Sequence, residues 1–389
     1  MKNIKRSVLF LLPFGKGMGV GHLTRQSVLG RALRAKGYET ILWSNGRISD
    51  IPAIFKDDME EGFTRILEPS AIMENALRFP SAPAAADLAE IENLVAVIMD
   101  DYRGLNDKDT AIWAARRKSL TAIVAQTHKQ GAIFAMVDGV PNLEFDLPDF
   151  IINLELGYDE KLYKPGWLKR MLWSGEHKYA LMRPAFFNPE PIAEQIPDNA
   201  FAVMIGGTDP KNAAQSILEG MIGTPYNPVL VAGKSSKTED QAKQQKWQET
   251  LAEFPQSAWV GGLNSGQMHT LWNKVKLTFL GPGATPSREL LFARCPFVGV
   301  FSNPSLEEQV KALEKMGIPT LRAQNHAEFM ASWGDEKSPV TAKFGKDDIQ
   351  KAVRRLEELG YIKNRLPDAP PFNQVDEHGA ERLVKALGL

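Results

Sequence analysis

Residues 7–37 read SVLFLLPFGKGMGVGHLTRQSVLGRALRAKG, in which a strand, a glycine-rich loop and a helix follow one another directly. The apolar run Ser7–Phe14 predicts a buried β-strand, and apolar residues at helical spacing predict a helix over Leu23–Lys36. Gly37 stands where a helix commonly ends, and Tyr38–Trp43 is predicted to be the next strand. This order of elements is typical of a parallel α/β sheet.

The same alternation recurs along the rest of the chain. Short apolar runs that end in polar residues predict further strands, because strands covered by helices on both faces have this pattern. These runs are Leu94–Met99, Ala132–Val137, Phe150–Leu154, Phe201–Ile205, Pro228–Ala232, Val275–Leu280, Phe297–Phe301 and Ile318–Leu321. Helices are predicted at Asn212–Met221, Ser287–Arg294, Leu306–Met316, Asp347–Leu359 and Glu377–Leu387.

The proline-rich stretch Pro189–Pro197 separates two halves that share this pattern. The sequence therefore predicts an α/β protein with two doubly wound, Rossmann-like domains that face a cleft. We expect these domains over residues 1–190 and 198–365, and we expect residues 366–389 to form a linker and a helix that crosses back to the first domain. Because ligands of open parallel sheets bind beyond the carboxyl ends of the strands, the ligand is expected between the two domains.

The composition and charge of the chain exclude several classes of protein. Of the 389 residues 43% are hydrophobic, and 46 basic against 47 acidic side chains leave a net charge of −1. A nucleic-acid footprint needs concentrated positive charge, so no nucleic-acid partner is expected. The single cysteine, Cys295, excludes an internal disulfide and a zinc site built from cysteines, and it fits a reducing cytoplasm. No stretch approaches the ~20 apolar residues of a membrane span, so we expect a cytoplasmic protein without membrane insertion.

The loop between the first strand and the first helix holds the first candidate site. Its four glycines, among them Gly19 and Gly21, let the backbone approach a ligand, and N–H groups at the helix start favour an anion. His22 lies at the same positive helix end, where a neutral imidazole that acts as a base is favoured. Arg25 follows one turn later, which departs from the dinucleotide pattern Gly-x-Gly-x-x-Gly. The alternative is a tight turn with a helix-capping histidine.

Two more glycine loops follow strands in the second half. Gly206-Gly207-Thr208-Asp209 is either an anion-binding loop or a domain-facing turn in which Asp209 caps the next helix. The loop Gly281–Pro286 precedes a helix with Glu289 in its predicted first turn. Backbone N–H groups there would face nucleotide phosphates, and the Glu289 carboxylate would accept hydrogen bonds from ribose hydroxyls. The alternative is a solvated Glu289 at the positive helix end. The candidate nucleotide-binding residues are Gly206, Gly207, Thr208, Gly281, Gly283, Thr285 and Glu289.

Acidic residues follow two strands of the first half. Asp100-Asp101-Tyr102 comes directly after Leu94–Met99, and Asp138 follows the next strand. Carboxylates at strand ends are placed for a sugar hydroxyl or a catalytic proton, and the alternative is solvated loop charges. The chain lacks an Asp-x-Asp pair before a strand end, so metal-independent chemistry without a cofactor is expected. The remaining histidines that we interpret as structural are His128, His177, His269 and His326.

Taken in order, these segments resemble the UDP-2,4-diacetamido-2,4,6-trideoxy-β-L-altropyranose hydrolase family. That family acts in pseudaminic acid biosynthesis and is related to the MurG-like, GT-B nucleotide-sugar glycosyltransferases. The resemblance covers most of the chain. It rests on Gly19-x-Gly21-His22-x-x-Arg25, Asp100-Asp101-Tyr102, Asp138, Asp149–Asn153, Tyr179-Ala180-Leu181-Met182-Arg183-x-x-Phe186, Gly206-Gly207-Thr208-Asp209, Glu289-Leu290-Leu291 and Gly379-Ala380-x-Arg382.

The resemblance implies a GT-B fold and metal-free hydrolysis of a UDP-activated sugar at its anomeric carbon, with release of UDP and free sugar. His22 matches the family's catalytic histidine, which is taken to activate water. The resemblance places on the sugar side Tyr102, Asn153, Tyr179 and Arg183, and the other candidate substrate-binding residues are Gly19, Gly21, Arg25, Asp100 and Asp138. It places Gly207, Thr208 and Glu289 on the nucleotide side, to which Asn303 is added.

The chain departs from the family in three places. Pro282 and Pro286 stand in a phosphate loop that is rich in serine and glycine in relatives, and proline offers no N–H donor. Relatives carry an Asn-Gln pair after the next strand, whereas here Asn303 is followed by a proline and Gln309 lies six residues downstream of Asn303. Extra sequence around Leu162–His177 lengthens the chain.

Three functions stay open on the sequence. A nucleotide-sugar hydrolase would use His22 to activate water. A GT-B glycosyltransferase would use the same histidine to deprotonate an acceptor hydroxyl. A nucleotide-sugar-binding protein without activity is disfavoured, because His22 and the strand-end carboxylates have no purpose in simple binding. The nucleotide sugar is the predicted partner in each case, and the sequence indicates neither the sugar nor the oligomeric state.

Overall fold

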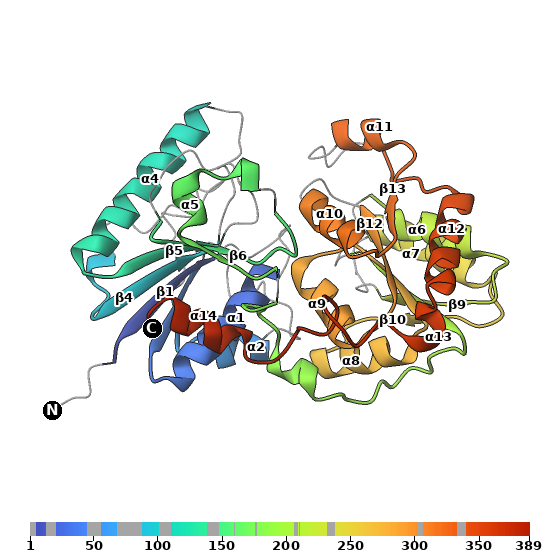
Figure 1. Cartoon of the computed structure of the whole chain (residues 1–389), viewed down its shortest axis with the longest axis horizontal. Coiled ribbons are helices and arrows are strands. Elements are labelled where there is room, and N and C mark those ends of the chain that lie inside the picture. Colours follow the sequence, from blue (N-terminus) through green and yellow to red (C-terminus); the bar gives the residue numbers. More distant parts are fainter. Residues whose placement is uncertain are drawn as a thin grey trace. The chain divides into compact units, whose positions relative to one another are not determined.

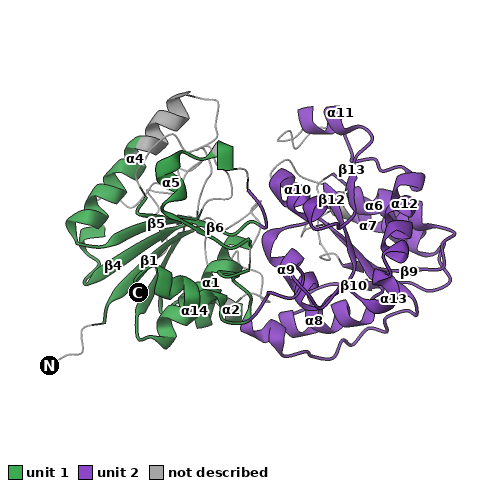
Figure 2. Ribbon diagram, viewed as in Figure 1, with its two compact units in different colours: residues 1–155, 159–183, 377–389 green, residues 156–158, 184–376 purple. Residues whose placement is uncertain are grey.

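The computed structural model describes residues 5–12, 21–44, 56–67, 88–100, 110–137, 148–158, 160–175, 177–205, 209, 211–231, 238–301, 306–332 and 340–389. The chain forms two compact units (Figure 2). The first comprises residues 1–155, 159–183 and 377–389, and the second comprises residues 156–158 and 184–376. The C-terminal helix therefore belongs to the same unit as the N-terminal strands.

The first unit contains a seven-stranded parallel sheet in the order β3-β2-β1-β4-β5-β6-β7 (Figure 1). Its strands are β1 (Ser7–Leu12), β2 (Glu39–Ser44), β3 (Arg65–Leu67), β4 (Leu94–Met99), β5 (Ile133–Val137), β6 (Phe150–Asn153) and β7 (Met171–Trp173). Its helices are α1 (Gly21–Ala35), α2 (Lys56–Gly62), α4 (Thr110–Lys129), α5 (Pro165–Leu168) and α14 (Gly379–Ala386), with the 3-10 turn η3 (Glu160–Leu162). The strand order changes direction between β1 and β4, which defines a doubly wound sheet. The place where it changes direction is called the switch point of the sheet.

Helix α1 is held between the sheet and the C-terminal helix. Leu29 and Leu33 of α1 are fully buried in one apolar cluster with Phe10 of β1. Leu383 of α14 belongs to the same cluster, so α14 covers the side of α1 that would otherwise meet water. Helix α14 also approaches the segment between β7 and η4 closely, because a Cβ atom added to Gly379 would lie 2.0 Å from the Ala180 carbonyl oxygen.

The second unit repeats this construction with a six-stranded parallel sheet in the order β10-β9-β8-β11-β12-β13. Its strands are β8 (Ala200–Met204), β9 (Asn227–Val231), β10 (Ala258–Val260), β11 (Leu277–Leu280), β12 (Phe297–Phe301) and β13 (Thr320–Arg322). Its helical segments are η4 (Pro184–Phe187), α6 (Ala213–Met221), α7 (Thr238–Leu251), α8 (Ser265–Lys274), α9 (Ala284–Phe292), α10 (Glu307–Lys315), α11 (His326–Ala331), α12 (Lys346–Glu358) and α13 (Tyr361–Asn364). Phe201 and Ile217 lie in its core with Ile349 of α12.

The two parallel, doubly wound sheets confirm the predicted fold class. Each predicted strand is present with small shifts at its ends, and β4 and β12 have the predicted bounds. The strands β3, β7 and β10 were not predicted. Each has three residues and lies at a sheet edge, where little of a strand is buried and the apolar run is short; β13 is equally short but was predicted because Ile318 lengthens its apolar run.

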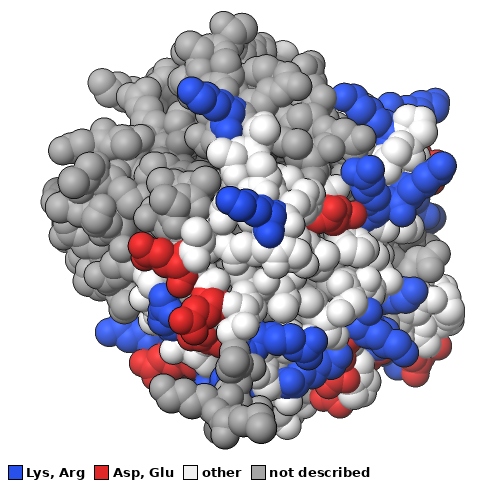
Figure 3. Space-filling view, turned by 90° about the vertical axis from the view of Figure 1, so that its left-hand side faces the viewer, with Lys and Arg blue, Asp and Glu red and all other residues white. Residues whose placement is uncertain are grey.

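On the described part of the face shown in Figure 3, Lys and Arg side chains are interspersed with Asp and Glu side chains. Among the large hydrophobic side chains of the described residues, Met330 is the one that is exposed, at 37%. None of the described helices combines the length and the apolar character that crossing a membrane requires.

Candidate functional site

The switch point of the first sheet joins residues that are far apart in the sequence. Strand β4 pairs with β1, with Met99 opposite Leu11. Asp100 follows β4 directly, and its N–H donates to the Leu11 carbonyl at 2.9 Å, which ties together the carboxyl ends of the two strands. Helix α1 follows β1 in the chain, and its first turn lies beside the carboxyl ends of these two strands. Ligands of doubly wound sheets bind at this point, so it is the first candidate site.

Three side chains of α1 contact the carboxylate of Asp100. They lie on one face of the helix because they are three and four residues apart. His22 Nδ1 is 2.8 Å from Asp100 Oδ1, and Gln26 Nε2 donates to Oδ2 at 2.9 Å. Arg25 donates twice, from Nε to Oδ2 at 2.5 Å and from Nη2 to Oδ1. Each carboxylate oxygen therefore faces two nitrogen atoms of α1.

The Asp100 carboxylate is buried but ionised. Its side chain is 0% exposed, whereas His22 and Arg25 keep 19% and 17% of their side-chain surface exposed. Burial alone would raise the pKa of Asp100, but the charge of Arg25 and the hydrogen bonds from Arg25 and His22 outweigh burial and hold that pKa well below its usual range. Asp100 is therefore negatively charged at neutral pH.

The negative charge of Asp100 decides which ring nitrogen of His22 carries the hydrogen. A hydrogen on Nδ1 makes a charge-assisted bond to Asp100 Oδ1, whereas a lone pair there would face the anion. Arg25 Nη2 also lies 2.9 Å from Nδ1, but it is closer to Oδ1. We therefore assign the Nδ1–H tautomer, which puts the lone pair on Nε2. In such a pair, the carboxylate orients the ring and stabilises the cation that forms when Nε2 takes up a proton.

The structure brings together three residues that the sequence nominated separately, His22, Arg25 and Asp100. It adds Gln26, which is fully buried and was not predicted. Its position one helical turn from His22 and next to Arg25, on the helix face that both share, was the available signal. Gly21 is the first residue of α1. The other predicted residues of this site, Gly19, Tyr102 and Asp138, lie outside the described residues.

The remaining sugar-side candidates lie elsewhere in the first unit. Asn153 ends β6 and is 1% exposed; its Nδ2 donates to the Tyr163 hydroxyl at 3.0 Å, and its Oδ1 accepts from the Glu155 N–H at 2.9 Å. These bonds hold the turn that follows β6. Tyr179 is 8% exposed and packs in the core of the unit. Arg183 is half-buried and is the last residue of the unit before η4.

The second sheet has the same construction at its own switch point. Gly281 follows β11, and its N–H donates to the Met204 carbonyl of β8 at 2.9 Å. This is the position that Asp100 occupies in the first unit. The first unit thus places a buried carboxylate after its fourth strand in the sheet order, whereas the second places a glycine loop that leads into α9. The predicted nucleotide-binding residues Gly206, Gly207, Thr208 and Asn303 lie outside the described residues.

Helix α9 begins earlier than the sequence analysis predicted. It starts at Ala284 with Gly283 as its N-cap residue, so Pro286 lies in its first turn and Glu289 in its second. Proline is tolerated in a first turn because the N–H that it lacks would have no acceptor within the helix. The predicted start at Ser287 and the first-turn position of Glu289 are therefore wrong. The N–H groups of Ala284 and Thr285 have no acceptor in their own helix either, so the loop keeps donors despite its prolines.

The start of α9 buries polar side chains. Glu289 is 3% exposed, which excludes the alternative that its carboxylate is solvated. Arg288 is 2% exposed and donates from Nη1 to the Ala284 carbonyl at 3.1 Å. Ser287 is fully buried, and its Oγ has no hydrogen-bond partner among the described residues. A buried hydroxyl without a partner costs free energy, and a bound ligand is one means of compensating it.

Asp209 caps a helix, which was one of the two interpretations of the sequence. Its carboxylate accepts from the N–H groups of Ala213 and Ala214 at 2.8 and 2.9 Å at the start of α6. Burial raises the pKa of Asp209, although the charge of Lys243 and the two backbone bonds oppose that shift. Lys243 Nζ donates to the Asp209 carbonyl at 2.6 Å, which ties α7 to the same turn.

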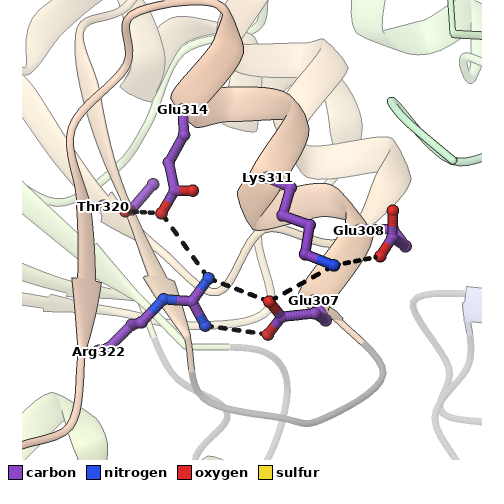
Figure 4. Close-up of polar contacts among 6 residues, drawn as sticks. All are labelled: Glu307, Glu308, Lys311, Glu314, Thr320 and Arg322. Carbon is purple, nitrogen blue, oxygen red and sulfur yellow. Dashed lines mark hydrogen bonds and ion pairs between the residues drawn. The ribbon is translucent and has the colours of Figure 1, made fainter. Parts of the chain in front are cut away.

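Charged side chains also form a network between α10 and β13 (Figure 4). Arg322 donates to both carboxylate oxygens of Glu307, at 2.9 and 3.2 Å, and its guanidinium lies 5.0 Å from the ring centroid of Phe301. The bond from Arg322 lowers the pKa of Glu307. Lys311 and Glu314 extend the network along α10. Arg322 and Glu307 are 35% and 38% exposed, so solvent weakens these ion pairs. We interpret the network as a structural contact between α10 and β13.

The described residues hold no group of three or more His, Cys, Asp or Glu side chains arranged to bind a metal ion. The described part of the chain therefore contains no candidate metal centre. The expected metal independence stays a prediction that an activity measurement has to test.

No protein-family model and no curated protein matches the chain. Solved structures match it over almost its whole length. The calicheamicin glycosyltransferase CalG4 has 12% identity and a TM-score of 0.59, with 99% of this chain and 98% of that chain covered. The UDP-GlcNAc 2-epimerase of Methanocaldococcus jannaschii, in complex with UDP-GlcNAc and UDP, has 12% identity and a TM-score of 0.54, with 99% of both chains covered. Acinetobacter baumannii MurG has 9% identity and a TM-score of 0.53, with 98% and 99% covered. With its two Rossmann-like units, the chain has the GT-B fold.

Proposed function

We propose that this chain is an enzyme that hydrolyses a UDP-activated amino or deoxy sugar at its anomeric C–O bond, releasing UDP and the free sugar. The observation that carries the proposal is the contact of His22 with the buried, ionised Asp100 at the switch point of the first sheet. The M. jannaschii structure of the same fold contains UDP-GlcNAc and UDP, which supports a UDP-sugar as the class of substrate. The resemblance to the pseudaminic acid hydrolases supports the amino or deoxy sugar.

Hydrolysis needs a base for water and stabilisation of the departing diphosphate. In the proposed reaction, His22 Nε2 takes a proton from water while the water oxygen attacks the anomeric carbon. The bond from that carbon to the phosphate oxygen breaks, and its electron pair leaves with UDP. Asp100 stabilises the imidazolium that forms on His22. Because UDP is already a good leaving group, water placement and diphosphate stabilisation are the main tasks.

The second unit would bind the nucleotide. N–H groups at the start of α9 would face the diphosphate, since the first turn of a helix favours anions. Glu289 would accept hydrogen bonds from the ribose hydroxyls. We keep the loop residues in this role as part of the proposal, namely Gly206, Gly207, Thr208, Gly281, Gly283, Thr285 and Asn303. We also keep on the sugar side Gly19, Gly21, Tyr102, Asp138, Asn153, Tyr179 and Arg183.

Glycosyl transfer is the second candidate. The same His22 Nε2 would deprotonate an acceptor hydroxyl in place of water, and the neighbour CalG4 is described as a glycosyltransferase. The two reactions differ in what they need besides the nucleotide sugar. A hydrolase releases UDP with water alone, whereas a transferase releases it at a comparable rate only when an acceptor is present.

The test is incubation of the full-length protein with a panel of UDP-sugars, with and without acceptor alcohols and sugars, while free UDP is measured. The matched variant is His22→Asn, which we expect to lower kcat by ~10²–10⁴-fold with little change in KM. In ¹⁸O water a hydrolase places ¹⁸O on the sugar and leaves UDP unlabelled. Label on UDP would mean attack at phosphorus and would refute the proposal. An epimerised UDP-sugar without UDP release, or a fully active His22→Asn variant, would refute it as well.

A further inference from the structure

We propose that Arg25 is a positioning residue, which holds the Asp100 carboxylate ionised and in one orientation so that Asp100 can orient the His22 ring. It would act on the reaction through Asp100 and not by binding the substrate, which is the role that the sequence analysis predicted for it. The inference rests on the proposed function of His22 as the general base. It extends that function by naming Arg25 as the residue that keeps Asp100 able to orient His22.

A buried carboxylate stays charged only where other groups compensate its lost hydration. Asp100 is completely buried, so its charge needs a nearby cation or several hydrogen-bond donors. Gln26 supplies a neutral donor, and it does so while its own Oε1 is buried without a hydrogen-bond partner among the described residues. His22 supplies a second donor in its neutral form. Arg25 is the contact of Asp100 that carries a permanent positive charge.

The shape of the guanidinium group also fixes the plane of the carboxylate. Nε and Nη2 of Arg25 donate to different oxygens of Asp100, which is the bidentate arrangement. Two parallel bonds prevent the carboxylate from rotating about its own axis. Oδ1 is thereby kept 2.8 Å from His22 Nδ1. A lysine at the same position would supply the charge as a single point and would leave this rotation free.

A double-mutant cycle distinguishes positioning from substrate binding. It uses the full chain with Arg25→Gln, Asp100→Asn and both together, and measures kcat and KM for UDP release from the UDP-sugar that the panel identifies. If Arg25 acts through Asp100, we expect Arg25→Gln to lower kcat by ~10–100-fold with KM little changed. The double variant should then be within about twofold of Asp100→Asn alone, because the second change removes nothing further. A raised KM at unchanged kcat, or losses that multiply, would overturn the proposal.

A measurement without substrate keeps the test independent of the proposed function. Histidine side-chain ¹⁵N spectra report which ring nitrogen carries the hydrogen, and the chain has six histidines to resolve. We expect His22 to be the Nδ1–H tautomer in the native protein and to lose that preference in Arg25→Gln. Arg25→Lys should restore it in part, since the charge returns without the second bond. An unchanged tautomer in Arg25→Gln would overturn the proposal even if His22→Asn abolishes activity.

The matched control is Arg31→Gln on the same helix. Arg31 pairs with Glu61, and both side chains are about half exposed, at 48% and 55%. We expect this variant to keep kcat and the His22 tautomer, because it removes a charge from α1 without touching Asp100. If Arg31→Gln lowers kcat as much as Arg25→Gln does, the effect belongs to the charge or stability of α1, and the positioning role is refuted.

Discussion

Replacing Asp100 by asparagine removes one negative charge from a completely buried position and keeps the size of the side chain. In the native protein each carboxylate oxygen accepts from two nitrogen atoms of α1, so an amide NH2 group in either orientation would face two donors. Arg25, which is 17% exposed, would also lose its counter-ion. Breaking a buried pair on one side costs about 3–5 kcal/mol, and we expect the lower end because Arg25 reaches solvent.

The pH dependence of this loss follows from the direction of the Asp100 pKa shift. The folded-state pKa lies below the ordinary value of 3.8, so the unfolded chain binds the proton more readily than the folded one. Asp100 therefore stabilises the native protein above that value, and the contribution is lost as the pH falls through the folded-state pKa. The free-energy difference between native protein and variant should be fully present at pH 7 and should shrink below about pH 4, as Asp100 becomes protonated.

Urea denaturation at several pH values measures this difference. The control is Asp348→Asn, since Asp348 is exposed and accepts one bond from Gln324 at 3.1 Å. We expect that control to change the free energy of unfolding by no more than about 0.5 kcal/mol. Equal stability of native protein and Asp100→Asn at pH 7 would refute the reasoning, and so would a difference that does not shrink below about pH 4.

Three further predictions concern the nucleotide site, metal dependence and the C-terminal helix. Glu289→Ala should weaken UDP binding by roughly 1–3 kcal/mol in calorimetric titration, and undiminished binding would remove Glu289 from the nucleotide site. EDTA should leave turnover unchanged, and activity that is lost with EDTA and regained with magnesium or manganese would contradict metal independence. Gly379→Ala should destabilise the protein by about 1–3 kcal/mol in urea denaturation, because its Cβ would meet the Ala180 carbonyl at 2.0 Å. Gly166→Ala, with nothing within 4 Å of its Cβ, is the control and should show no comparable loss.

The central strands and the doubly wound order could be predicted because their signal is local. Strands such as β4 and β12 are buried on both faces, so nearly every residue in them is apolar and the run itself marks their bounds. The start of α9 was missed for a local reason too. Pro286 was taken as the last residue of the loop, whereas a first helical turn accepts a proline.

The candidate site could be predicted only in part. Glycine loops, His22 and a strand-end carboxylate are visible in the sequence, because each belongs to one strand–loop–helix unit. That Asp100 is bound by α1 was not visible, since Arg25 and Asp100 are 75 positions apart and meet only when β4 pairs with β1. The sequence by itself determined the local elements and the types of chemical group they carry. The tertiary structure alone decided that the Asp100 carboxylate is buried, ionised and bound to His22, because burial and charge pairing arise only where separate elements pack together.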